Sequence, residues 1–130
     1  MLQLENINLN LPERDNLLRD VSITIKPGRL TVITGPNGGG KTSLARIIAG
    51  LYTPTSGRII LDDEDITGMS ITERARKGIA YAFQQPVSFK GINVRTLMGI
   101  AAGGEMSEMH MCRILEKVGL CATGPRRARI

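Results

Sequence analysis

The chain of 130 residues is 42% hydrophobic, 22% charged and 3% aromatic, which fits about one globular domain. This composition excludes collagen-like, mucin-like and wholly disordered chains, and no apolar run is long enough to span a bilayer. Three arginines close to the C-terminus carry most of the net charge of +5, so we expect no nucleic-acid partner. The N-terminus shows no secretory signal and two cysteines make no disulfide framework, so we expect a cytoplasmic chain without direct membrane insertion.

The first half of the chain carries mainly strand patterns. Residues 2–9 and 21–25 alternate apolar and polar side chains, which predicts two half-buried strands. Residues 30–34 form a short, β-branched run that predicts a third strand directly before a glycine-rich segment. Apolar side chains then recur with helical spacing over residues 44–51, and residues 57–61 predict another strand.

A short helix and a further strand are predicted in the middle of the chain. Ser70 and Glu73 have the spacing of a capping box, which favours a helix that begins after Ser70 and ends at Gly78. Residues 79–83, with the sequence Ile-Ala-Tyr-Ala-Phe, predict a strand.

Two more helices are predicted in the last third of the chain. Asn93 is a suitable cap for an apolar stripe over residues 94–101, which the glycines after it interrupt. Ser107 is a suitable cap for a second stripe over residues 111–118. We therefore expect a mixed α/β domain that continues into a helical part.

The glycine-rich segment carries the chemistry. Residues 35–42 match G-x-x-x-x-G-K-[ST], in which glycines let successive backbone N–H groups turn toward a phosphate. Lys41 is expected to reach the β- and γ-phosphates of a nucleotide, and the Thr42 hydroxyl to bind Mg²⁺. The predicted nucleotide-binding residues are Gly35, Pro36, Asn37, Gly38, Gly39, Gly40, Lys41, Thr42 and Ser43.

An acidic segment offers an alternative metal ligand. Residues 59–64 resemble an apolar strand that ends in carboxylates, and in another P-loop enzyme, such as a small kinase, Asp62 would bind Mg²⁺. The segment follows Lys41 by only 21 positions, a distance at which a strand could still return beside the phosphate-binding strand. Residues 62–65, followed by Ile66-Thr67, look like a hairpin turn with solvated carboxylates, and we adopt that interpretation. The sole histidine, His110, is interpreted as a helix-surface or packing residue.

Three motifs in order resemble the ATP-binding cassette (ABC) ATPases. Residues 35–42 follow Pro27-Gly28-Arg29-Leu30, residues 51–59 repeat the family's Thr-Pro…Ser-Gly strand start, and residues 79–87 resemble its Q-loop. The resemblance extends to about residue 122 and implies an α/β P-loop NTPase fold. This fold has a RecA-like core with an antiparallel β subdomain, here truncated, and the start of a helical subdomain.

The resemblance also implies an organisation into parts. Residues 1–92 would form a partial nucleotide-binding core with the antiparallel β subdomain, and residues 93–122 the start of the helical subdomain. Residues 123–130 form a basic tail that does not match the family. The central sheet of such domains takes further strands from beyond residue 130, so we expect an exposed strand edge, with low stability or association as the consequence.

Cofactors and partners follow from the same resemblance. It implies ATP and Mg²⁺ as ligands, with Gln84 as the glutamine that contacts Mg²⁺ and the attacking water, and Gln85 as the alternative register. Thr42 and Gln84 are thus the predicted metal-binding residues. A second cassette subunit, in a homodimer, and a scaffold or membrane partner protein are also implied.

Within the family, residues 82–92 look most like the SufC-type ATPases of iron–sulfur cluster assembly, and a transporter's nucleotide-binding subunit is the neighbouring interpretation. The family's signature segment and its Walker B Asp-Glu pair do not occur in the 130 residues, which suggests a truncated or frame-shifted product. No aromatic residue lies between positions 8 and 16, where many cassettes stack adenine. We therefore expect nucleotide–Mg²⁺ binding with little or no turnover, and a non-catalytic nucleotide-binding module is the second hypothesis.

Overall fold

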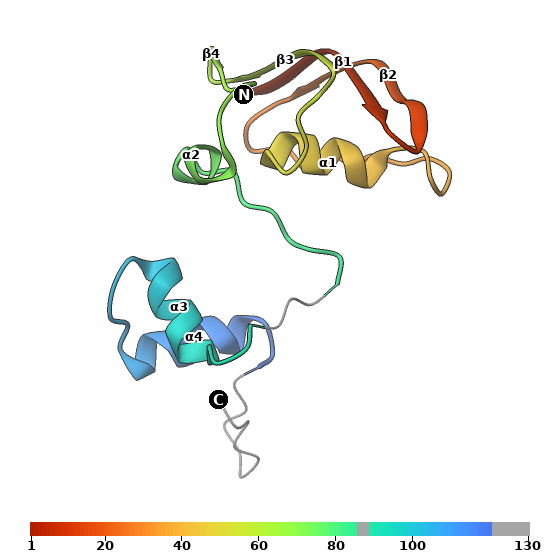
Figure 1. Ribbon diagram of the computed structural model, residues 1–130. Helices are drawn as coiled ribbons and strands as arrows, with labels where there is room; N and C mark the ends of the chain where they lie inside the picture. The colour runs from red at the N-terminus through yellow and green to blue at the C-terminus, as the bar shows by residue number, and fades with distance from the viewer. Residues whose placement is uncertain (86–88, 121–130) are drawn as a thin grey trace. The chain divides into compact units, whose positions relative to one another are not determined.

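The computed structural model describes residues 1–85 and 89–120, and it divides into two compact units (Figure 1). The first unit comprises Met1–Ala82, and the second begins at Phe83. Over the described ranges, no helix combines the length and the hydropathy needed to cross a membrane. The predicted basic tail, residues 123–130, lies outside the described residues, and the predicted domain bounds remain predictions.

A four-stranded antiparallel sheet forms the body of the first unit. Its strands are β1 (Leu2–Leu11), β2 (Arg14–Ile25), β3 (Ser56–Leu61) and β4 (Glu64–Asp65), in the spatial order β2-β1-β3-β4. Tight turns join β1 to β2 and β3 to β4, as expected for antiparallel neighbours. This confirms the strands predicted at 2–9, 21–25 and 57–61, and it is the antiparallel sheet that the resemblance implied.

A β-bulge in β1 explains why the apolar pattern changes phase. Leu4 and Ile7 are an odd number of residues apart, yet both belong to the same buried core. Asn6 adopts a φ of 51°, and the register with β2 shifts between Leu4 and Ile7, which brings Ile7 onto the core face. Gly57 of β3 approaches this bulge so closely that a Cβ would lie 2.6 Å from the Asn6 carbonyl oxygen.

Helix α1 (Lys41–Ala49) lies across one face of the sheet (Figure 1). Its apolar stripe, predicted from the spacing of Leu44 and Ile47, packs into the sheet's core, and Ile47 is fully buried. The helix ends at Gly50, whose φ of 82° allows its N–H to return to the carbonyl oxygens of the last turn. The buried core of this unit comprises Leu4, Ile7, Leu9, Leu18, Leu44, Ile47, Ile59 and Ile66.

The acidic segment forms a hairpin turn, as the sequence indicated. Asp62 and Asp63 connect β3 to β4 with φ values of 47° and 67°. Ser70 and Glu73 form the predicted capping box at the start of α2 (Ile71–Arg76), in which the Ser70 side chain accepts from the Glu73 N–H.

Two strands predicted from the sequence are not formed. Residues 30–34 and 79–83 carry no strand hydrogen-bond ladder, although their side chains suit a buried strand. A strand needs a neighbour, and neither segment pairs with another strand within the described part of the chain. The side chains of Leu30 and Val32 are consequently 93% and 71% exposed.

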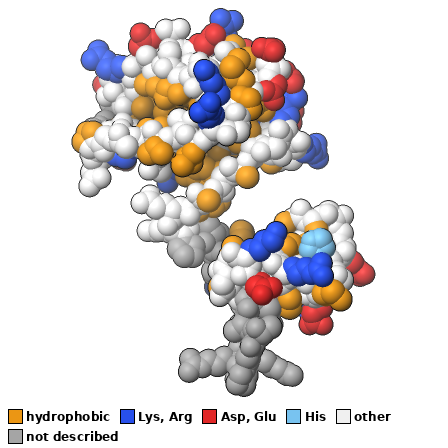
Figure 2. Space-filling model, turned by 180° about the vertical axis from the view of Figure 1, so that it is seen from behind, with side chains coloured by type: hydrophobic (Ala, Val, Ile, Leu, Met, Phe, Trp, Pro, Cys, Tyr) orange, Lys and Arg blue, Asp and Glu red, His pale blue; other side chains and the backbone are white. Residues whose placement is uncertain are grey.

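Figure 2 shows hydrophobic side chains gathered on one face of the first unit.

The second unit is helical over the residues described. Helix α3 (Val94–Ala102) is capped by the Asn93 side chain, and α4 (Glu108–Lys117) by that of Ser107, as predicted. Met111 and Leu115 provide the buried side chains of α4.

Candidate functional site

The glycine-rich segment forms a tight loop that ends on the sheet. The Gly39 N–H donates to the Pro36 carbonyl oxygen at 3.1 Å, while Gly38 and Gly40 adopt φ values of 77° and 82°. A Cβ at Gly40 would lie 2.5 Å from Leu18 Cδ2 and 3.1 Å from the Leu17 carbonyl oxygen. Glycine is therefore required at position 40 by both its backbone conformation and its contact with β2.

The Lys41 side chain folds back over this loop. Its Nζ donates to the carbonyl oxygens of Gly35 and Pro36, both at 2.7 Å. These contacts hold a positive charge over the loop. An ammonium has three donors, and two of them are engaged here, so the group can still donate to a bound anion.

The start of α1 adds further positive potential at the same place. Its N-cap, Gly40, has no side chain that could cap the first N–H groups, and its first turn contains no acidic residue. These N–H groups and the positive end of the helix dipole lie next to the loop, which favours an anion there. The Thr42 side chain is exposed in this first turn and that of Ser43 is half-buried.

The predicted binding residues are thus gathered on one continuous segment. Gly35–Gly40 form the loop, and Lys41, Thr42 and Ser43 form the first helical turn. The arrangement offers the Lys41 ammonium and the backbone N–H groups of the glycine loop, which suit a phosphate chain. The Thr42 hydroxyl suits the metal ion that accompanies such a chain. Their part in binding remains a prediction.

The alternative metal ligand lies elsewhere. Asp62 is exposed in the β3–β4 turn, where its carboxylate pairs with the N-terminal ammonium of Met1. No group of three or more His, Cys, Asp or Glu side chains in the described ranges is arranged to hold a metal ion. The hairpin interpretation of residues 62–65 therefore agrees with the structure.

The predicted catalytic glutamine belongs to the second unit. Gln84 and its register alternative, Gln85, are both exposed, and residues 86–88 of the predicted Q-loop lie outside the described residues. A site that joins Gln84 to the loop on the first unit therefore remains a prediction. His110 is exposed on α4, which agrees with its interpretation as a surface residue.

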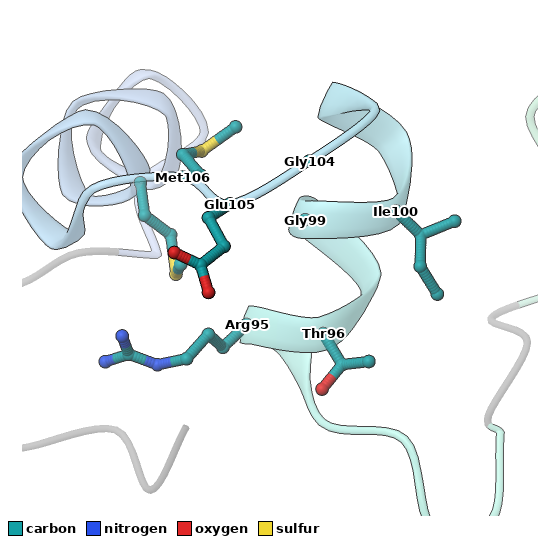
Figure 3. Close-up of a pocket in the computed structure, with 8 residues that line it drawn as sticks. Arg95, Thr96, Gly99, Ile100, Gly104, Glu105 and Met106 are labelled. Carbon is teal, nitrogen blue, oxygen red and sulfur yellow. The ribbon is translucent and has the colours of Figure 1, made fainter.

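A pocket that sequence reasoning did not indicate lies in the second unit. It has a volume of about 670 Å³ and lies between α3 and the segment leading to α4. Figure 3 shows the side chains of Arg95 and Glu105 on the same side of α3, whereas Ile100 points away from them. The lining combines these two charged side chains with Met106 and Met111, while the ion-pair partner of Arg95 is Glu108 at 3.0 Å, and no sequence motif marks the pocket.

Comparisons with known proteins agree with the geometry. The sequence profile of the family described as "ABC transporter" matches residues 18–129. An uncharacterized ABC transporter ATP-binding protein of Methanocaldococcus jannaschii is 40% identical over 100 residues, which cover 75% of this chain and 40% of that protein. The lipopolysaccharide export system ATP-binding protein LptB of Escherichia coli K12 is 30% identical over 129 residues, which cover 88% of this chain and 54% of LptB.

A solved structure shows the same fold. A dimeric ATP-binding cassette in a post-hydrolysis state, bound to ADP and Pi, superposes with a TM-score of 0.70 at 28% identity, over 89% of this chain and 55% of that one. This chain belongs to the ABC transporter family, and its mixed α/β fold is that of the family's ATP-binding cassettes. The matched segment spans about half of these relatives' length, or less.

Proposed function

We propose that this chain binds ATP with Mg²⁺ as the nucleotide-binding part of an ABC transporter ATPase. The observation that carries the proposal is the closed loop at residues 35–40, with the Lys41 ammonium held 2.7 Å from two of its carbonyl oxygens at the start of α1. A glycine loop, a compact cation and a helix N-terminus that meet at one point favour a polyphosphate over other anions.

Each part of the site has a separate role in this proposal. The loop N–H groups and the α1 N-terminus bind the phosphate oxygens, and Lys41 neutralises charge on the β- and γ-phosphates. The Thr42 hydroxyl provides one ligand for Mg²⁺, a cation that accepts few protein ligands. When bound, Mg²⁺ supplies positive charge shared between the two terminal phosphates.

Hydrolysis needs a further group that orients water. In the described ranges, β3 is the apolar strand that acidic residues follow. The first of these residues, Asp62, lies in the hairpin turn and pairs with the N-terminal ammonium. The family resemblance leaves Gln84 as the remaining candidate for the group that orients water. We therefore propose that the 130-residue chain binds nucleotide with little or no turnover.

The transporter interpretation is preferred to the SufC-like one. The relatives described above are named as transporter ATP-binding proteins, whereas the SufC resemblance rests on residues 82–92 alone. By analogy with the dimeric cassette, we propose a second cassette subunit as partner, together with a membrane protein.

A titration of the purified chain with Mg-ATP tests the proposal. We expect saturable binding that Lys41→Ala weakens at least about tenfold, because a charge-assisted contact to phosphate is lost. Lys26→Ala is the matched control, since Lys26 is an exposed lysine outside the loop. Absence of binding by the unaltered chain, or equal affinity in the Lys41→Ala protein, would refute the proposal.

Phosphate release separates the proposed binding function from catalysis. We expect a rate indistinguishable from that of the Lys41→Ala protein. A rate that Lys41→Ala abolishes would show that the chain is a working ATPase and would overturn the proposed lack of turnover.

A further inference from the structure

Arg74 is buried in the first unit, and none of the described residues gives it an acidic partner. Its side chain is 2% exposed. Among the described residues, it is the one charged side chain that is fully buried. Burial lowers the pKa of its guanidinium, since a charge in the interior loses its hydration. A buried charge persists only where other groups satisfy it, and no carboxylate is among the hydrogen-bond partners of Arg74.

Four main-chain carbonyl groups accept hydrogen bonds from the Arg74 guanidinium in place of a carboxylate. Nη1 donates to the carbonyl oxygens of Ile47 at 2.6 Å and Ile48 at 3.0 Å, both in the last turn of α1. Nη2 donates to Thr67 at 2.8 Å and Nε to Met69 at 3.1 Å, in the segment between β4 and α2. One side chain therefore joins the end of α1 to the segment that follows the sheet.

These contacts complete the C-terminus of α1. The last four carbonyl groups of a helix have no partner within the helix, and a cation close to them also interacts favourably with the helix dipole. Gly50 makes room for this arrangement, because a Cβ there would lie 3.2 Å from Arg74 Nε. A side chain at position 50 would require Arg74 to shift by a few tenths of an ångström.

The other end of the same helix carries the proposed phosphate site. Helix α1 has only nine residues, so its direction depends on how each end is held. Gly40 sets the N-terminal end against β2, and Arg74 sets the C-terminal end. A loose C-terminal end would let the helix tilt and would move Lys41 and the first N–H groups away from the phosphates.

We propose that Arg74 is a positioning residue of the nucleotide site, which acts through the last turn of α1 and does not touch the nucleotide. The inference rests on the proposed nucleotide binding. It differs from a merely structural role, in which loss of Arg74 would lower stability while the folded molecules bound Mg-ATP normally.

Three variants of the full chain test this inference. Arg74→Met keeps the length of the side chain but removes its charge and its donors, and Arg74→Lys keeps the charge with fewer donors. Arg76→Met is the matched control, because Arg76 is an exposed arginine on the same short helix. Mg-ATP affinity is measured at a temperature at which each protein is folded, as shown by its thermal transition.

We expect Arg74→Met to weaken Mg-ATP binding about tenfold, Arg74→Lys to recover part of the affinity, and Arg76→Met to leave it unchanged. In the nucleotide-free protein, we expect Arg74→Met to accelerate amide exchange over residues 44–50 more than in the sheet. Wild-type affinity in folded Arg74→Met protein, or acceleration that is equal throughout the unit, would overturn the inference.

Two further comparisons keep these outcomes separable. If Arg74→Met does not fold, Arg74→Lys is compared with Ile66→Ala, a variant of the buried core that keeps the Arg74 guanidinium, under conditions that fold both. Weaker binding in Arg74→Lys supports the inference, and equal binding overturns it. Failure of the unaltered chain to bind Mg-ATP counts against the proposed function, whereas normal binding by Arg74→Met beside impaired binding by Lys41→Ala counts against Arg74 alone.

Discussion

Replacement of Gly40 by alanine is predicted to loosen the contact between the nucleotide loop and the sheet. An L-residue at a φ of 82° costs about 1–2 kcal/mol of conformational strain. The added Cβ would also lie 2.5 Å from Leu18 Cδ2, and overpacking at a buried contact costs about 1–3 kcal/mol. Together these effects predict that Gly40→Ala lowers the free energy of unfolding by about 2–5 kcal/mol.

Two other glycines separate the two contributions. Gly28 has a φ of 67° with nothing within 4 Å of its would-be Cβ, so Gly28→Ala measures backbone strain alone. Gly68 has neither a positive φ nor a close neighbour, so Gly68→Ala is expected within about 0.5 kcal/mol of the unaltered chain. Denaturant unfolding gives the free energy of unfolding of the three variants. The loss in Gly40→Ala should exceed the loss in Gly28→Ala by the overpacking contribution.

The Leu18 contact is tested by a double-mutant cycle. If the Cβ at position 40 meets Leu18, then Leu18→Ala should relieve part of the penalty, which gives a coupling energy of about 0.5–3 kcal/mol. A Gly40→Ala protein as stable as Gly28→Ala, with additive behaviour toward Leu18→Ala, would refute the close approach of the loop to β2.

Two further predictions concern carboxylates. Hydrogen bonds from Ser70 lower the pKa of Glu73, and hydrogen bonds from Thr67 lower the pKa of Asp65. Both carboxylates therefore stabilise the fold at pH values above their unfolded pKa. This stabilisation is lost as the pH falls through their folded pKa values. Unfolding measured across the acid range should therefore show declining stability, and Glu73→Gln should flatten the decline; an unchanged profile would contradict the assigned hydrogen bonds. Asp62→Ala is expected to leave the Mg²⁺ dependence of ATP binding unchanged, because Asp62 pairs with the N-terminus in a hairpin turn. A Mg²⁺ titration that shifts markedly in this variant would instead support a metal-ligand role.

The features that sequence reasoning predicted well are those that neighbouring residues determine. The capping box at Ser70 and Glu73, the cap at Asn93 and the glycine loop before Lys41 each depend on residues only a few positions apart. Their geometry follows from local hydrogen bonds, so one sequence is sufficient to recognise them.

Features that depend on distant partners were not predictable in the same way. The bulge at Asn6 became visible only through its register with β2 and its contact with Gly57. Arg74 lies in the run Glu-Arg-Ala-Arg-Lys, which in sequence has the appearance of a solvated helix face. Its burial results from the position of the α1 end, which no local pattern encodes.

The segment at 30–34 shows why a correct residue pattern can still give a wrong element. Its β-branched residues have the propensity for a strand, but propensity is weak compared with the hydrogen bonds and burial that a neighbouring strand supplies. Leu30 is 93% exposed, so burial does not stabilise an extended conformation at that position. The loop that follows keeps its shape because the contacts that hold it, Lys41 with the Gly35 carbonyl and Gly40 with β2, lie within or beside the loop itself. The proposed phosphate site therefore depends on α1 and the antiparallel sheet, and its geometry persists although residues 30–34 form no strand.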